Sequence, residues 1–154
     1  MASYYLDTSA LVKAFAREQG TAWAAALVDP AAGHTLYTVR LTGPEMVAAL
    51  GRKARTGELT AAASAHAVAA FRRSWRRRPN VVAATVVLTD RAMDLAEQHG
   101  LRGYDAAHLA AALIIADRQR ADGLAPLTFV SADRAQRQAA DAEGLPVDDP
   151  NAYP

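Results

Sequence analysis

The apolar positions of the chain follow two different periods. Short runs rich in β-branched, aromatic and leucine residues are typical of buried strands, and longer segments repeat their apolar positions with the spacing of a helix. The predicted strands are 3–6, 35–39, 83–88, 127–130 and 146–147. The predicted helices are a first segment through residue 15, followed by 23–28, 44–55, 59–75, 91–99, 104–120 and 134–143.

This alternation of strands and helices predicts an α/β fold. Strands separated by helices form a mostly parallel sheet, here of about five short strands, with helices packed on it to give three layers. The segment 104–120 is apolar almost all round up to residue 116, so we expect it to be buried. We expect one domain over residues 1–150 and a short tail over 151–154.

Composition narrows the class of protein. The chain has no cysteine, which excludes disulfides and thiolate metal sites. The amino terminus does not read as a signal peptide, and the longest apolar stretch, 106–116, is too short to cross a bilayer. We therefore expect a soluble cytoplasmic protein with no membrane partner. A net charge of +1 gives no global electrostatic attraction to nucleic acid, so any such contact must be local.

Acidic residues stand where strands give way to helices or where helices begin. They are Asp7, Glu45, Asp105 and Asp133. Such junctions can open onto one edge of an α/β sheet, where ligands bind. Carboxylates gathered there repel one another strongly unless a hard divalent cation sits among them. The pattern therefore indicates metal-dependent chemistry.

Each acid also has a structural interpretation when it is considered alone. Asp7 and Asp133 are placed to cap the helices that follow them, and Glu45 is the last residue of a Thr-x-x-Glu capping box. Asp105 can complement the positive end of its helix dipole. Asp90, which also lies between a predicted strand and a predicted helix, is assigned to capping alone. Position by itself therefore leaves both interpretations open.

Several motifs in a fixed order carry a family resemblance. The first strand is followed by Asp-Thr-Ser-Ala-Leu, and the order continues with Arg-Leu-Thr-x-x-Glu-x-x-x-Ala-Leu, Gly-Tyr-Asp-Ala-Ala-His-Leu-Ala-Ala-Ala, Phe-Val-Ser-Ala-Asp-Arg and Ala-Glu-Gly-Leu-Pro-Val. Together these resemble the PIN-domain ribonucleases, and most closely the VapC-like toxins of bacterial and archaeal toxin–antitoxin pairs. The resemblance runs over nearly the whole chain.

The resemblance implies a site and a cofactor. It makes Asp7 and Asp105 the principal ligands of Mg²⁺ or Mn²⁺. The other roles that it implies are Glu45 and Asp133 as the remaining metal ligands, and Ser9 and Ser131 as supporting hydroxyls. The activity so implied is a metal-dependent endoribonuclease that hydrolyses RNA phosphodiesters.

The resemblance also implies partners. Relatives of this kind form homodimers through the helices near the second and fourth acids, and a small DNA-binding antitoxin covers their acidic groove. Two alternatives stay open: a PIN nuclease of RNA processing that is no toxin, and a catalytically silent PIN-like module that binds RNA or protein.

His108 follows Asp105 by three residues, so the two can share one helix face. An Asp-x-x-His pair can bind metal. Because the helix is otherwise apolar, we favour a buried histidine with hydrogen-bond partners over a metal ligand.

An arginine cluster surrounds Trp75 near the end of the segment 59–75. Its members are Arg72, Arg73, Arg76, Arg77 and Arg78. One interpretation is phosphate contact, with Arg73 and Arg77 as the candidate RNA-binding residues and Trp75 stacking on a base. The other is favourable placement of cations at a helix carboxyl end, with Trp75 packed inside. We favour packing for Trp75 and leave the arginines open.

Overall fold

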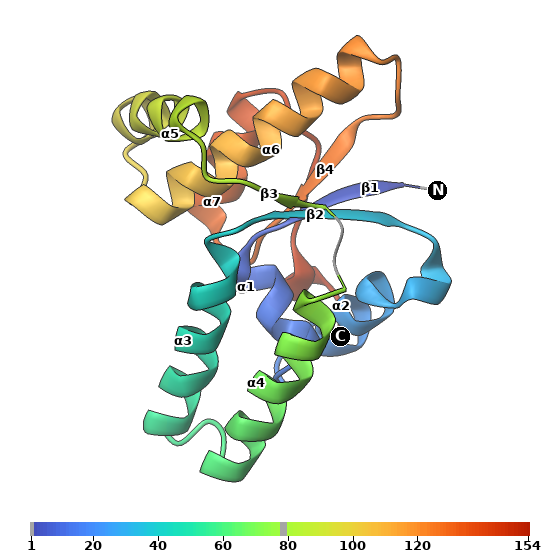
Figure 1. The fold of residues 1–154 in the computed structure, drawn as a ribbon, viewed down its shortest axis with the longest axis vertical. Coiled ribbons are helices and arrows are strands. Elements are labelled where there is room, and N and C mark those ends of the chain that lie inside the picture. The colour runs from blue at the N-terminus through green and yellow to red at the C-terminus, as the bar shows by residue number, and fades with distance from the viewer. Residues whose placement is uncertain (1, 78–79) are drawn as a thin grey trace.

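A parallel five-stranded sheet forms the middle layer of the protein, as the computed structural model shows for residues 2–77 and 80–154 (Figure 1). The strands are β1 (Ser3–Leu6), β2 (Thr35–Val39), β3 (Val81–Val82), β4 (Leu127–Val130) and β5 (Val147–Asp148). Their order across the sheet is β3-β2-β1-β4-β5, and every neighbouring pair is parallel. The predicted fold class is confirmed.

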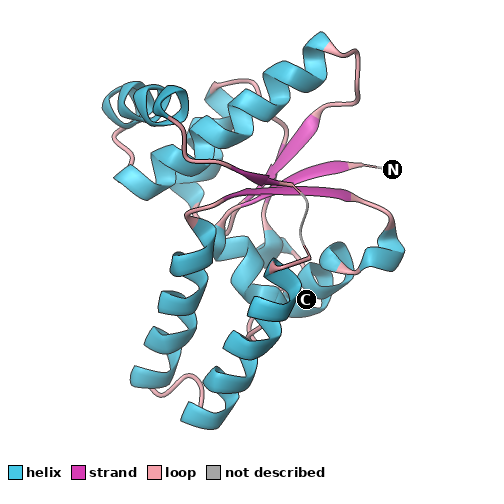
Figure 2. Cartoon of the chain, viewed as in Figure 1, coloured by secondary structure: helices cyan, strands magenta, loops and turns pink. Residues whose placement is uncertain are grey.

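Helices cover both faces of the sheet (Figure 2). One face carries α1 (Thr8–Leu11), α2 (Thr21–Val28), α3 (Thr42–Arg55) and α4 (Ala61–Trp75), and the other carries α5 (Val86–His99), α6 (Gly103–Ala121) and α7 (Arg134–Ala142). Short 3₁₀ turns are η1 (Val12–Ala14), η2 (Pro30–Ala32) and η3 (Pro150–Ala152). The antiparallel pair α3 and α4 extends away from the sheet (Figure 1).

Alternation along the strands divides the core in two. Tyr5 and Phe129 stack with ring centroids 5.5 Å apart and pack against α6. Leu6 and Val130, the next residue of each strand, pack on the opposite face, where they meet Met46 of α3. Successive side chains of a strand point to opposite faces, so each of these strands contributes to both layers.

Helix α6 is buried along most of its length, as predicted. Nearly every side chain from Ala106 to Ala116 is shielded from solvent. The many alanines let the helix lie close to the sheet, which suits tight packing. Within the described residues, no helix combines the length and the apolar character needed to cross a membrane.

The prediction of a strand over residues 83–88 is wrong. The chain leaves β3 after Val82, and α5 begins at Val86, where the Thr85 hydroxyl accepts a hydrogen bond of 3.2 Å from the Leu88 amide. Val86 and Val87, at the start of α5, are exposed. Their β-branched side chains are typical of strands, which explains the wrong prediction. Asp90 is therefore an exposed residue inside α5, and its predicted role as a cap is also wrong.

Candidate active site

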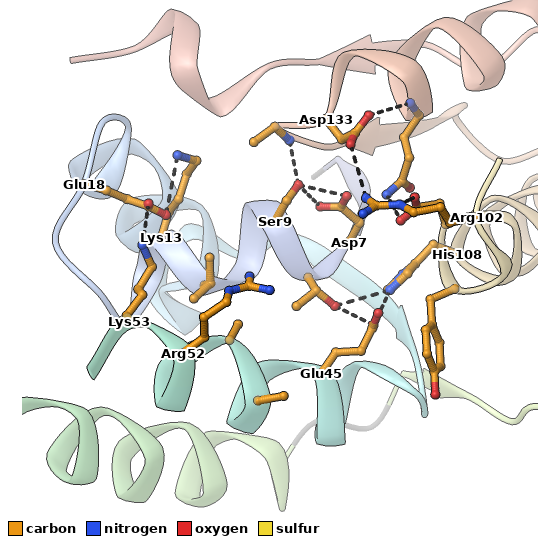
Figure 3. A pocket seen from close by; sticks show the side chains of 18 of the residues that line it. Asp7, Ser9, Lys13, Glu18, Glu45, Arg52, Lys53, Arg102, His108 and Asp133 are labelled. Atoms are coloured by element: carbon orange, nitrogen blue, oxygen red, sulfur yellow. Dashed lines mark hydrogen bonds and ion pairs between the residues drawn. The ribbon is translucent and has the colours of Figure 1, made fainter. Parts of the chain in front are cut away.

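A cavity of about 550 Å³ opens at the carboxyl ends of the central strands. Strand β1 lies at the centre of the sheet, with the earlier strands on one side and the later ones on the other, so the chain order reverses between β1 and β4. Ligands bind at such a switch point in open α/β sheets. The cavity brings together the acids predicted from the sequence, since Asp7, Glu45, Asp105 and Asp133 all line it (Figure 3).

Asp7 is the most buried of these acids, with 1% of its surface exposed. Its Oδ1 accepts a hydrogen bond of 2.8 Å from the Ala10 amide, so it caps α1, as one interpretation expected. The hydroxyls of Ser9 and Ser131 donate to the same carboxylate at 2.7 Å and 2.6 Å. Burial raises the pKa of Asp7, although His108 and these hydrogen bonds act in the opposite direction.

The two serines also join the ends of β1 and β4. Their hydroxyl oxygens are 3.3 Å apart. Ser9 accepts from the Ala132 amide at 2.8 Å, and Ser131 accepts from the Asp133 amide at 3.0 Å. Both hydroxyls therefore tie Asp7 to the loop that carries Asp133.

Glu45 does not form the capping box that its spacing suggested. The N-cap of α3 is Leu41, which makes no side-chain cap bond. Instead Oε2 of Glu45 accepts from the Thr8 hydroxyl at 2.6 Å and lies 2.7 Å from Nε2 of His108. Burial opposes the charged form, but the bonds from His108 and Thr8 outweigh it and lower the pKa of Glu45.

His108 is buried and hydrogen-bonded, as predicted. It is 1% exposed, and its Nδ1 lies 3.0 Å from the Tyr5 hydroxyl. Burial, followed by the charges of Asp7 and Glu45, raises the pKa of Tyr5, so that hydroxyl stays protonated and donates to Nδ1. With Nδ1 engaged by Tyr5, Nε2 is the ring atom that donates to Glu45.

Asp105 and Asp133 share one cation from the protein itself. Nε of Arg102 donates to Oδ2 of Asp105 at 2.8 Å, and Nη2 of Arg102 lies 3.7 Å from Oδ2 of Asp133. The Gln136 amide holds the other oxygen of Asp105 at 2.9 Å. Asp133 caps α7 through the Gln136 backbone amide, as one interpretation expected.

The donor chemistry of this cavity fits a hard divalent cation. Its carboxylate oxygens are the ligands that Mg²⁺ and Mn²⁺ prefer. The Arg102 guanidinium forms ion pairs with Asp105 and Asp133, so these carboxylates already bind a positively charged group. Across the described ranges, however, no three acidic or histidine side chains are grouped tightly enough to hold a metal ion. A metal would therefore require the carboxylates to draw closer together.

Several contacts of the site were not predicted from the sequence. Thr8, Arg102 and Gln136 each bind a site carboxylate. A signal did exist for Arg102, which precedes Asp105 by three residues and so lies one helical turn away. Gln136 binds an acid of another helix, and no local spacing indicates that.

The candidate RNA-binding arginines lie elsewhere. Arg73 and Arg77 are exposed, and neither lines the cavity. Trp75 is half-buried, lies against Gly43 and meets Phe71 with ring centroids 5.4 Å apart, which confirms its packing role. Arg78 lies outside the described residues.

Comparison with known proteins identifies the class. The PIN domain family matches residues 4–142, so the chain belongs to that family. The relatives Ribonuclease VapC45 of Mycobacterium tuberculosis strain CDC 1551 / Oshkosh and Ribonuclease VapC49 of strain H37Rv are each 40% identical over 114 residues, which is 73% of this chain and 76% of the relative.

Solved structures share the fold. PAE2754 from Pyrobaculum aerophilum aligns with a TM-score of 0.57 at 22% identity, over 96% of this chain and 83% of the other. FitAcB from Neisseria gonorrhoeae aligns with a TM-score of 0.59 at 14% identity, over 96% and 97% of the two chains. At such identities the likeness concerns the fold alone.

Proposed function

We propose that this PIN-domain protein is a Mg²⁺- or Mn²⁺-dependent endoribonuclease that acts in the cytoplasm as the toxin of a toxin–antitoxin pair. The observation that carries the proposal is the gathering of Asp7, Glu45, Asp105 and Asp133 around one cavity at the switch point of the sheet. The ribonuclease names of the relatives at 40% identity support RNA as the substrate.

The proposed roles follow from the surroundings of each acid. Asp7 and Asp105 would hold the ion, and Asp133 would be a further ligand of it or help to hold a second ion. When bound, the ion would neutralise the charge of the phosphodiester and acidify a water. Buried Asp7 gains most from a nearby cation, because its charge is the one most removed from solvent.

Glu45 is the residue proposed to position or deprotonate the attacking water. The lowered pKa of Glu45 keeps it ionised at neutral pH. The bonds from Thr8 and His108 use Oε2, and no hydrogen bond to Oε1 is found among the described residues. That second oxygen is therefore the atom we assign to the water.

A cognate small DNA-binding antitoxin is the proposed protein partner. The contact of Arg102 with Asp105 and Asp133 supports a competing role for an antitoxin arginine or lysine, because these carboxylates already accept a guanidinium. A homodimer is also part of the proposal. The family resemblance implies an interface on the helices near Glu45 and Asp133, whereas the exposed apolar side chains lie on α5 and at the start of α6 and offer a different surface; they include Val86, Val87, Met93 and Tyr104.

The two alternatives differ from the proposal in what they require. A PIN nuclease of RNA processing would have no adjacent gene for a small DNA-binding protein. A silent RNA- or protein-binding module would neither bind Mn²⁺ nor cleave RNA. Four carboxylates around one cavity favour a catalytic protein, because clustered charges cost free energy that a silent module has no need to bear.

Cleavage of total RNA tests the proposal. The wild-type protein, Asp7→Asn and the exposed control Asp90→Asn are incubated with RNA and Mg²⁺ or Mn²⁺, with and without a chelator, and the new ends are mapped. We expect metal-dependent cleavage by the wild type and by Asp90→Asn, and loss of cleavage by Asp7→Asn. Cleavage at the wild-type rate by a folded Asp7→Asn protein would refute the assignment.

A further inference from the structure

The cavity that contains the acids continues into a group of basic residues. Lys13 of η1 and the neighbours Arg52 and Lys53 of α3 line the end away from Asp105 and Asp133, together with Glu18 (Figure 3). A volume of about 550 Å³ is far more than a metal ion needs and is in the range of sites for small organic ligands. The cavity therefore has an acidic end and a basic end.

The two lysines at the basic end are held by the protein. Nζ of Lys13 donates to the Gln19 carbonyl at 2.9 Å and lies 3.5 Å from Glu18. Nζ of Lys53 lies 3.1 Å from Glu18 and 2.8 Å from Glu58. Their charges are thus already paired, so we assign them to the structure of this end.

Arg52 differs from both lysines. Its side chain is exposed and lines the cavity. Within the described part of the chain its guanidinium takes part in no ion pair and no side-chain hydrogen bond. Figure 3 shows it extending from α3 toward the space between the lysine group and the acids. A guanidinium offers a planar set of donors that matches a phosphate, and this one is free to bind.

The spacing along α3 relates Arg52 to the acidic end. Arg52 follows Glu45 by seven residues, which is about two turns, so both lie on one side of the helix about 10 Å apart along its axis. A phosphodiester at Glu45 would therefore have a neighbouring phosphate of the same strand within reach of Arg52. The acids themselves repel a polyanion, so the strand needs a cationic contact at this distance.

We propose that Arg52 binds a backbone phosphate of the RNA next to the one that is cleaved, and so sets the path of the strand across the cavity. This subsite rests on the proposed ribonuclease function and deepens it. The proposed contact puts a positively charged group for RNA binding on α3, inside the cavity. Arg73 of α4 and Arg77, which follows that helix, lie outside the cavity and are not required for this contact.

The test compares Arg52→Gln with Arg55→Gln. Arg55 is exposed on the same helix and does not line the cavity, so both variants lose the same charge. Binding of a short single-stranded RNA without divalent metal is followed by fluorescence polarisation over a range of salt. We expect Arg52→Gln alone to lose about tenfold in affinity. Its salt slope should fall by about 0.7, the value for one phosphate on a single strand.

Cleavage with Mn²⁺ supplies the second readout. Arg52→Gln should raise KM and leave kcat close to that of the wild type, and Arg52→Lys should recover part of the affinity because it restores the charge. An unchanged salt slope in Arg52→Gln would overturn the subsite, and so would equal losses in both glutamine variants. If those results came with active wild-type enzyme, the ribonuclease assignment would stand without the subsite. A wild type that neither binds nor cuts RNA would overturn both.

Discussion

Nε2 of His108 lies 2.7 Å from Oε2 of Glu45, so a buried imidazole of α6 holds a carboxylate of α3. The other ring nitrogen is engaged by the Tyr5 hydroxyl of β1 at 3.0 Å. Because both nitrogens have partners and the ring is buried, its orientation is fixed relative to the sheet. His108 therefore acts through Glu45, as a positioning residue.

Replacing His108 with alanine should reduce cleavage and stability together. We expect kcat to fall about 10- to 100-fold, as for other residues that orient a site carboxylate. We also expect a loss of about 1–3 kcal/mol of unfolding free energy, because Tyr5 and Glu45 lose a buried partner. Steady-state kinetics and urea unfolding measure the two effects. His108→Gln should regain part of kcat, and exposed His66→Ala serves as the control. An unchanged kcat in His108→Ala would contradict this role.

Asp7→Asn should stabilise the metal-free protein while it abolishes cleavage. Burial raises the pKa of Asp7, so its ionised form costs free energy in the fold. Asparagine removes that charge and keeps an oxygen that can accept from the Ala10 amide. We expect the Tm to rise about 2–4 °C, which corresponds to about 1 kcal/mol for a domain of this size. A lower Tm would show that the lost bonds to the carboxylate outweigh the relief of charge.

The stability difference between Asp7→Asn and the wild type should depend on pH. A group whose pKa is raised in the folded state contributes to the free energy of unfolding below its unfolded-state pKa. That contribution is lost as the pH rises through the folded-state pKa. The variant's advantage should therefore be largest at neutral pH and shrink as pH falls through the raised pKa of Asp7. Glu45 has a lowered pKa, so its contribution to stability is lost in acid. The loss occurs in the wild type and in the variant alike and cancels in their difference. Melting curves across pH test this, and a constant difference would contradict it.

Local sequence predicted most of the sheet and failed at one strand. The strands at 3–6, 35–39 and 127–130 were predicted with the bounds that the structure has. Each is flanked by turn or capping residues and is packed on both faces. In 83–88 the same residue types begin a helix, because the Thr85 cap and the burial of Leu88 on α6 decide the conformation. Composition alone does not distinguish these cases.

The acids of the site could be predicted because their position after a strand or at a helix start is a local property. Their partners could not. The bonds from His108 to Glu45 and from Gln136 to Asp105 join different helices, and they exist only once α3, α6 and α7 are packed. The sequence therefore indicated which residues form the site, and tertiary contacts determine how each is oriented.

Removing Arg102 should strengthen metal binding. The Arg102 guanidinium forms ion pairs with the carboxylates of Asp105 and Asp133, so a metal cation has to compete with it for them. Because Arg102 is largely exposed, the ion pairs are weak, and we expect Arg102→Gln to bind Mn²⁺ about three- to tenfold more tightly. Calorimetric titration measures this. Arg91→Gln, which removes the pair with Asp117 outside the cavity, should leave the affinity unchanged. Weaker Mn²⁺ binding by Arg102→Gln would mean that Arg102 helps to assemble the site.

The proposed homodimer can be tested on its exposed apolar surface. Val86, Val87 and Met93 of α5 are 74%, 70% and 64% exposed, and Tyr104 at the start of α6 is 59% exposed. Met93 and Tyr104 line one apolar hollow together with Ala92 and Ala96. Exposed apolar surface of this kind is typical of an interaction site, and a charge placed there would have to lose its hydration on association. We expect the wild type to have the mass of a dimer in light scattering and Met93→Lys to have that of a monomer. Leu124→Lys, at a similarly exposed position in the loop before β4, should stay dimeric. Dimeric Met93→Lys protein would place the contact on another surface.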